Sequence, residues 1–202
     1  MSYRKENKFR VTLSDFYEFQ VQLHNLGMEA LFEPRLINSV YFDTTDLKMF
    51  NDSEEGVLPR KKVRIRWYGN SKLFALENKT SSVEGRFKVT TKLDNIIQEN
   101  ELLTRYRIDK QYGNIQPILK VSYIRSYFVF NQMRITFDQD ISYHNLRFAS
   151  KRKYYDPERV IEIKAPINCS DDFIGKFVPF STTRFSKYSR GLLLSLGDLN
   201  EI

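Results

Sequence analysis

Cationic side chains alternate along residues 60–68, which read Arg-Lys-Lys-Val-Arg-Ile-Arg-Trp-Tyr. In a β-strand, successive side chains point to opposite faces, so Lys62, Arg64 and Arg66 share one face and apolar residues occupy the other. Neighbouring cations on that face are about 6 to 7 Å apart at the usual strand rise. This spacing suits the phosphate groups of a polyphosphate chain, and repulsion among the cations favours an anion between them. The pattern predicts a phosphate-binding strand face, with a solvated basic strand as the alternative.

Other segments that we expect to be strands repeat this alternation of charged and apolar residues. Arginine forks suit bidentate contacts to phosphate oxygens, and lysine supplies a mobile charge. The few carboxylates among these cations could hold a hard divalent cation that bridges phosphates, or could simply pair with a neighbouring lysine or arginine. The candidate cations are Lys8, Arg10, Lys62, Arg64, Arg66, Lys79, Lys88, Arg125, Arg134 and Lys164, and the candidate carboxylates are Glu6, Glu77, Asp138 and Glu162.

The familiar catalytic motifs do not occur in the sequence. There is no Walker A sequence, Rossmann glycine fingerprint or nucleophile elbow. His24 and His144 lack a metal-ligand spacing, and Cys169 has no basic neighbour that would activate its thiol. Phosphoryl transfer needs none of these motifs, because it depends on positioning and charge stabilisation around a metal-bridged phosphate chain.

Composition points to an anionic partner for a folded protein. The 202 residues include 32 Lys and Arg against 25 Asp and Glu, a net charge of +7. Nucleic acid, acidic lipid, nucleotide and polyphosphate all fit this balance. The single cysteine is typical of a reducing compartment, and no apolar run is long enough to span a bilayer, so we expect a cytoplasmic protein without a membrane segment.

The elements that must position these residues follow from hydrophobic spacing. Ser14 is expected to cap a first helix, and residues 36–43 read as a strand. Residues 51–56 are polar and indicate a loop, and Asp94 is expected to begin a helix that continues to Leu103. No internal repeat and no linker rich in Gly, Pro and Ser divides the chain, which predicts a single domain over residues 1–202.

About eight strands with short turns and a few helices predict a mainly antiparallel α+β fold. The polar strand faces are dominated by Arg, Lys and Glu rather than by neutral polar residues. Closing the sheet would turn these faces inward, so we expect an eight-stranded barrel, a β tunnel with a charged lumen and flanking helices. Such a lumen must be wet or filled by a multiply charged ligand, because unpaired buried charge is costly.

The order of the charged segments resembles VTC domains, the polyphosphate polymerase domains of the triphosphate tunnel metalloenzyme superfamily, which are related to the CYTH group. The resemblance covers nearly the whole chain. The segments that carry it are Glu6-Asn7-Lys8, Lys62-Val63-Arg64-Ile65-Arg66, Glu77-Asn78-Lys79, Tyr123-x-Arg125, Arg134-x-Thr136-x-Asp138, Glu162-Ile163-Lys164 and Ser186-Lys187-Tyr188.

This resemblance implies a tunnel that binds the triphosphate of ATP with Mn²⁺ or Mg²⁺ and moves the terminal phosphoryl group onto a growing inorganic polyphosphate chain. The catalytic residues would be Arg64, Arg66 and Lys79. The metal would be held by Glu162, with Glu6, Glu77 and Asp138 as further candidates. The phosphate path would be lined by Lys8, Arg10, Lys62, Lys88, Tyr123, Arg125, Arg134, Lys164, Ser186 and Lys187.

One departure and two alternatives bear on this interpretation. Hydrolytic CYTH relatives usually begin with Glu-x-Glu-x-Lys, but Arg4 stands where the first Glu belongs, which favours the polymerase branch. Hydrolysis of tripolyphosphate or a nucleoside triphosphate in the same tunnel is the nearest alternative. A non-catalytic polyphosphate or nucleic-acid binding domain is the other, with Tyr123, Tyr127 and Phe128 as a stacking platform, although aromatics between strand cations are more often core. We expect no specific nucleic-acid partner, and the oligomeric state stays open.

Overall fold

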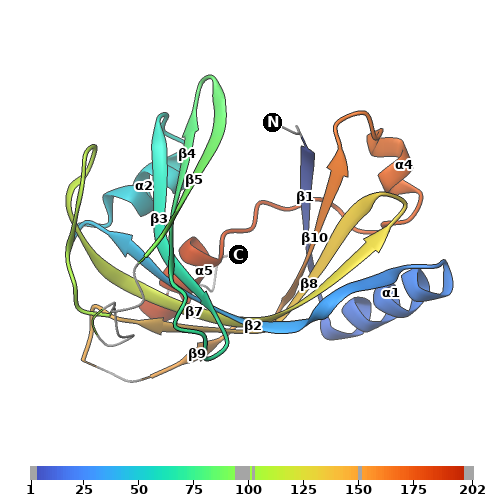
Figure 1. Ribbon diagram of the computed structural model, residues 1–202, viewed down its shortest axis with the longest axis horizontal. Coiled ribbons are helices and arrows are strands. Elements are labelled where there is room, and N and C mark those ends of the chain that lie inside the picture. The colour runs from blue at the N-terminus through green and yellow to red at the C-terminus, as the bar shows by residue number, and fades with distance from the viewer. Residues whose placement is uncertain (1–3, 94–100, 102, 150–151, 198–202) are drawn as a thin grey trace. The chain divides into compact units, whose positions relative to one another are not determined.

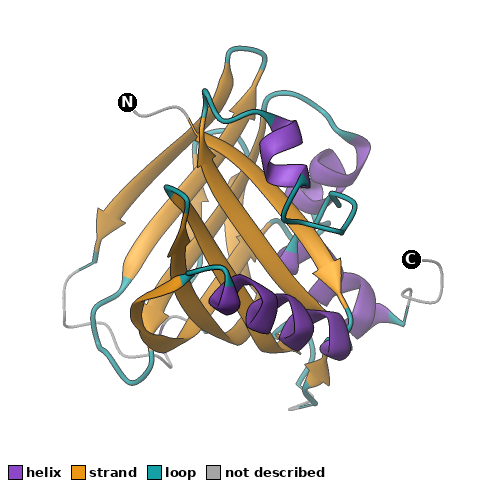
Figure 2. Cartoon of the chain, turned by 90° about the vertical axis from the view of Figure 1, so that its right-hand side faces the viewer, coloured by secondary structure: helices purple, strands orange, loops and turns teal. Residues whose placement is uncertain are grey.

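The computed structural model describes residues 4–93, 101, 103–149 and 152–197 (Figures 1 and 2). Most of the helix expected from Asp94 to Leu103 lies outside the described residues. The described helices are α1 (Leu13–Asn25), α2 (Lys48–Glu55), α4 (Asp171–Gly175) and α5 (Lys187–Leu196). The described strands are β1 (Arg4–Val11), β2 (Glu29–Asp43), β3 (Arg60–Tyr68), β4 (Ala75–Ser82), β5 (Gly85–Lys92), β6 (Arg107–Asp109), β7 (Gly113–Phe130), β8 (Met133–Asn145), β9 (Tyr154–Tyr155) and β10 (Arg159–Pro166).

The strands follow the order β1-β10-β8-β7-β2-β3-β4-β5, with β6 paired to β7 and β9 to β8. The pairs β1–β10, β10–β8, β2–β3, β3–β4 and β4–β5 are antiparallel, which confirms the predicted mainly antiparallel α+β class. None of the described helices is long and apolar enough to cross a membrane.

The predicted closed barrel is wrong, because the hydrogen-bonded order of the described strands is an open path that ends at β1 and β5. Closure would require these two strands to pair, and both carry lysines or arginines at alternate positions, a feature that opposes edge-to-edge pairing. The prediction assumed that charged strand faces must be enclosed. An open sheet leaves such faces to water, so their charge does not require closure.

The chain divides into two compact units. The first comprises Met1–Leu36, Tyr123–Ile141 and Asp156–Phe185, and the second Ile37–Ser122, Ser142–Tyr155 and Ser186–Ile202. Strands β2, β7 and β8 each contribute a segment to both units. The single domain over residues 1–202 stays a prediction.

In the first unit, the core lies between α1 and the apolar faces of β1, β8 and β10. Phe16 and Phe19 of α1 pack against Phe137 of β8, with ring centroids 5.2 and 6.2 Å apart. The N-cap of α1 is Thr12 rather than the predicted Ser14, since the Asp15 N–H donates to the Thr12 hydroxyl. Ser14 is instead the second helical residue. The helix therefore begins two residues earlier than predicted, and it buries its apolar stripe against the sheet.

In the second unit, the apolar faces of β2 and β3 form the core together with Met49 of α2. The predicted loop over residues 51–56 is mostly helical, because α2 continues to Glu55 and ends at Gly56, whose φ is 78°. The loop was predicted because these residues are polar, but polar residues also form exposed helices. The carboxylate of Asp43 accepts hydrogen bonds from the Met49 and Phe50 N–H groups at 2.8 and 2.9 Å and so satisfies the first turn of this polar helix.

The strand predicted over residues 36–43 is longer than expected, since β2 begins at Glu29. Its first eight residues are exposed and its last seven are buried. A segment that is exposed on both faces shows no alternation of apolar and polar residues, so the pattern could not reveal it.

Candidate functional site

The cationic face of the second unit is built by three adjacent strands. In β3, Lys62, Arg64 and Arg66 are half-buried while the intervening apolar residues are buried. The strand register places Lys62 opposite Lys79 of β4, and Lys79 opposite Lys88 of β5. Three lysines therefore lie in one row across three strands. Like charges directly opposite each other destabilise a sheet, and an anion bound along the row would offset their repulsion.

Arg64 is held in place by Glu77 and Tyr41. Its Nε donates to Glu77 Oε2 at 2.7 Å, and its Nη1 donates to the Tyr41 hydroxyl at 2.9 Å. Lys88 Nζ donates to the other Glu77 oxygen at 2.5 Å. Burial raises the pKa of Glu77, but the charges of Arg64 and Arg66 outweigh it and lower the pKa to about 2. Glu77 is thus a fixed anion that orients Arg64.

Tyr41 lies among cations on this face and was missed by sequence reasoning. Burial raises the pKa of its hydroxyl, but the charges of Arg64, Arg66 and Lys79 outweigh burial and lower the pKa to about 7. The Tyr41 ring stacks on Tyr188 of α5 at 5.1 Å between centroids. Alternation along β2 places Ser39 and Tyr41 on the same face as their β3 partners, Arg66 and Arg64. This alternation was the signal that could have identified Tyr41.

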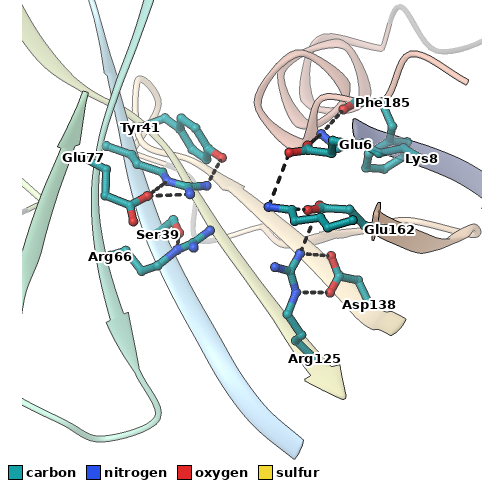
Figure 3. A network of polar contacts seen from close by, with 12 residues as sticks. Glu6, Lys8, Ser39, Tyr41, Arg66, Glu77, Arg125, Asp138, Glu162 and Phe185 are labelled. Atoms are coloured by element: carbon teal, nitrogen blue, oxygen red, sulfur yellow. Dashed lines mark hydrogen bonds and ion pairs between the residues drawn. The ribbon is translucent and has the colours of Figure 1, made fainter. Parts of the chain in front are cut away.

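Behind Tyr41, the phenol of Tyr188 donates to buried Asp43 at 2.5 Å. Burial and the adjacent carboxylate of Asp43 raise the pKa of Tyr188 well above its usual value. On the other side, Arg66 Nε donates to the Ser39 hydroxyl at 3.4 Å (Figure 3). Arg64 and Arg66 of β3 are therefore both oriented by side chains of β2.

The start of α5 adds hydroxyl groups to the same unit. Ser186 caps the helix, with its hydroxyl accepting from the Ser189 N–H at 3.4 Å, and it also accepts from Lys62 Nζ at 2.9 Å. Lys187 is half-buried in the first turn. Ser189 Oγ is buried without a hydrogen-bond partner in the described part of the chain, and sequence reasoning did not include it.

The polar face of the first unit carries a chain of ion pairs. The register of β1 and β10 places Glu6 opposite Lys164, and Lys8 opposite Glu162. Lys164 Nζ lies 2.9 Å from Glu162 Oε1 and 3.3 Å from Glu6 Oε2, and Lys8 Nζ lies 3.4 Å from Glu6 Oε1 (Figure 3). Burial raises the pKa of Glu162, but the charges of Arg125, Lys164 and Lys8 outweigh it and hold the pKa well below its usual range.

Asp138 and Arg125 form a buried bidentate pair in this chain. Arg125 Nε and Nη2 donate to the two Asp138 oxygens at 2.5 and 2.7 Å, and Asp138 is fully buried. Arg125 Nη2 also lies 3.8 Å from Glu162 Oε2, so Asp138 fixes an arginine that reaches the ion-pair chain. The ring of buried Tyr123 lies 5.4 Å from the Arg125 guanidinium.

The remaining two candidates of the first unit lie apart from these contacts. Arg10 pairs with Glu158 at 3.6 Å, and Arg134 is exposed opposite Lys164 in the β8–β10 register. The structure thus groups the predicted residues in two sets. The first unit holds Glu6, Lys8, Arg10, Tyr123, Arg125, Arg134, Asp138, Glu162 and Lys164, and the second holds Lys62, Arg64, Arg66, Glu77, Lys79, Lys88, Ser186 and Lys187.

The four candidate metal ligands differ in how well they fit a metal. Among the described residues, no three His, Cys, Asp or Glu side chains are placed together to hold one. Glu6 and Glu162 nevertheless converge on a single cationic atom, Lys164 Nζ, and two carboxylates with phosphate oxygens suit Mg²⁺ or Mn²⁺. Both Asp138 oxygens accept from Arg125, and Glu77 belongs to the other unit. Metal binding by any of the four stays a prediction.

Comparisons with known proteins agree with the resemblance drawn from the sequence. A family model described as VTC domain matches residues 3–196, which confirms that resemblance. The fold is similar to a proposed adenylate cyclase from Bacillus halodurans (TM-score 0.60, 15% identity, 91% of this chain and 95% of that chain). It is also similar to a proposed adenylyl cyclase from Hippeastrum described as having a dominant triphosphatase activity (TM-score 0.62, 13% identity, 98% of each chain). No curated protein matched the sequence.

Proposed function

The chain belongs to the VTC domain family, and on that premise we propose that it is a cytoplasmic, metal-dependent polyphosphate polymerase. It would transfer the terminal phosphoryl group of ATP to a growing inorganic polyphosphate chain. The observation that carries the proposal is the row of Lys62, Lys79 and Lys88 beside Arg64 and Arg66, since these five cations share one face of three strands. A chain of phosphates is the ligand class whose repeated charge matches such a row.

Arg64 and Arg66 of β3 would contact the transferring phosphoryl group together with Lys79. Arg64 is oriented by Glu77 and Tyr41 before any ligand binds, and preorganised donors stabilise developing charge at little reorganisation cost. The remaining cations and the hydroxyl of the second unit would bind the rest of the phosphate chain; they are Lys62, Lys88, Ser186 and Lys187.

On the first unit, Glu162 and Glu6 would hold the divalent metal, with Lys164 leaving their carboxylates to contact phosphate. When bound, Mg²⁺ or Mn²⁺ neutralises charge on the phosphate oxygens that it bridges. Arg125 is fixed by Asp138 through its Nε and Nη2 groups and would contact phosphate through its remaining N–H groups. The other phosphate contacts proposed for this unit are Lys8, Arg10, Tyr123 and Arg134.

Hydrolysis of a triphosphate is the second candidate. The observation in its favour is the similarity of the fold to the Hippeastrum protein described with triphosphatase activity. The same cations would bind the substrate, and only the acceptor would differ, water in place of a phosphate chain. Polymeric products therefore distinguish the two reactions.

Substitution of Arg66 tests the proposed role of the β3 face. Arg66→Ala should lower polyphosphate synthesis by about 100-fold or more, since removing one charge-stabilising donor costs about that factor. Its thermal unfolding should match the wild type, because the side chain is half-exposed. Arg105→Ala removes an exposed arginine elsewhere in the second unit and should leave synthesis unchanged. Full synthesis by Arg66→Ala would contradict the proposed site.

A further inference from the structure

An aromatic pair on the first unit lies outside the set of phosphate-binding residues. Phe32 of β2 and Tyr127 of β7 meet edge to face, with ring centroids 5.8 Å apart and planes at 82°. The guanidinium of Arg35 lies 4.8 Å from the Phe32 ring and 5.6 Å from the Tyr127 ring. These three side chains, which we call the Phe32 cluster, combine two ring faces with one guanidinium plane.

The Phe32 cluster is not part of a hydrophobic core. Phe32 is 52% exposed, and every residue of β2 from Glu29 to Leu36 is exposed. Neither Phe32 nor Tyr127 belongs to the buried cluster of the first unit, whereas their sheet neighbours Phe128 and Phe130 do. Burial of apolar area therefore does not account for two aromatic rings at this position.

The cluster is continuous with the cations of the first unit. Tyr127 follows Arg125 by two positions on β7, so both side chains point to the same face, about 6 to 7 Å apart. Arg125 contacts the ion-pair chain directly, because its Nη2 lies 3.8 Å from Glu162 Oε2. A phosphate held at Arg125 would lie next to the aromatic rings, at a separation that a ribose and its phosphate ester span.

We propose that the Phe32 cluster is a binding site for the base of the nucleoside triphosphate whose phosphates contact Arg125. This inference rests on the proposed function and adds to it a site for the nucleoside. Bases stack on aromatic rings and on guanidinium planes through their π-faces, without hydrogen bonds that select one base. The site therefore favours a nucleoside triphosphate over inorganic tripolyphosphate and discriminates little among purines.

Calorimetric binding of two ligands tests the site. A non-hydrolysable ATP analogue and inorganic tripolyphosphate, each with Mg²⁺, are titrated into the wild type and into Phe32→Ala. We expect Phe32→Ala to weaken analogue binding about tenfold, or about 1.4 kcal/mol, and to leave tripolyphosphate binding within about twofold. Tyr127→Phe retains the ring and should bind the analogue as the wild type does, whereas Tyr127→Ala should weaken it like Phe32→Ala.

A matched control is Phe148→Ala, which removes a phenylalanine of the second unit with the same 52% exposure and should change neither affinity. Unchanged analogue binding by Phe32→Ala would overturn the base site, and so would a parallel loss of both ligands, which would indicate a structural role. Either of these two results for Phe32→Ala would leave the proposed function intact, provided that the wild type binds tripolyphosphate. A wild type that binds neither ligand would contradict both proposals.

Discussion

Tyr41 should ionise near neutral pH in the folded protein, and this ionisation can be observed directly. The charges of Arg64, Arg66 and Lys79 lower its pKa from 10 to about 7, although burial acts in the opposite direction. At about pH 8 the hydroxyl is therefore about 90% ionised in the native state, while an ordinary tyrosine is about 1% ionised. Because the folded pKa is depressed, the stability that this group contributes is complete above pH 10 and is lost as pH falls through 7.

The shift corresponds to about 4 kcal/mol between the two protonation states, from about 1.36 kcal/mol per pKa unit. An ionised Tyr41 also cancels one positive charge beside Arg64, so it competes with a bound anion. Phosphate binding at Arg64 and Arg66 should raise the Tyr41 pKa and drive proton uptake. Tripolyphosphate affinity should accordingly fall as pH rises through about 7 in the wild type and stay flatter in Tyr41→Phe.

The assay is an ultraviolet absorbance titration of tyrosinate between about pH 6 and pH 9, with and without tripolyphosphate. The wild type should show a step near pH 7 with the amplitude of one tyrosinate among its twelve tyrosines. Tyr41→Phe should lack this step, whereas Tyr155→Phe, which removes a 69% exposed tyrosine, should keep it. Identical titrations of wild type and Tyr41→Phe would refute the electrostatic reasoning about this face.

Three further predictions concern the carboxylates. Glu77→Gln should lower the free energy of unfolding by about 3 kcal/mol at pH 7, because folding lowers the pKa of Glu77 from 4.5 to about 2. The loss should shrink as pH falls from 4.5 towards 2. Urea denaturation that shows an equal loss at pH 7 and near pH 2 would contradict this prediction. Asp138→Asn should cost about 3 kcal/mol because it removes the bidentate carboxylate partner of buried Arg125, whereas Asp171→Asn, at an exposed pair, should cost under about 1 kcal/mol in the same denaturation assay. Glu162→Gln should raise the Mn²⁺ or Mg²⁺ concentration needed for half-maximal turnover, and an unchanged metal titration would remove it from the metal site.

Alternation along single strands was the most informative part of the sequence. It predicted correctly that Lys62, Arg64 and Arg66 share one face of β3 and that the apolar residues between them are buried. The ordered charged segments also indicated the family correctly, and all of them except Ser186-Lys187-Tyr188, which lies at the start of α5, are on strands. A period of two needs only local information, which is why these inferences succeeded.

Partners across strands could not be predicted in the same way. The row of three lysines depends on the register of β3, β4 and β5, and no single segment determines register. The contact of Asp138 with Arg125 likewise joins two strands, and the sequence alone could not distinguish a metal ligand from an ion-pair partner. Closure of the sheet was predicted from the charged strand faces and from the family resemblance, although the charged face of an open sheet is stable in water.

The most direct test of the central claim is a gel analysis of phosphate products. Purified protein is incubated with ATP and Mn²⁺ or Mg²⁺, with and without a short polyphosphate primer. The account predicts a ladder of polyphosphate with release of ADP, and the Arg66→Ala variant should not form it. Free phosphate without polymer would contradict polymerase activity and indicate a triphosphatase, and the absence of any turnover would contradict an enzymatic role for the two cationic faces.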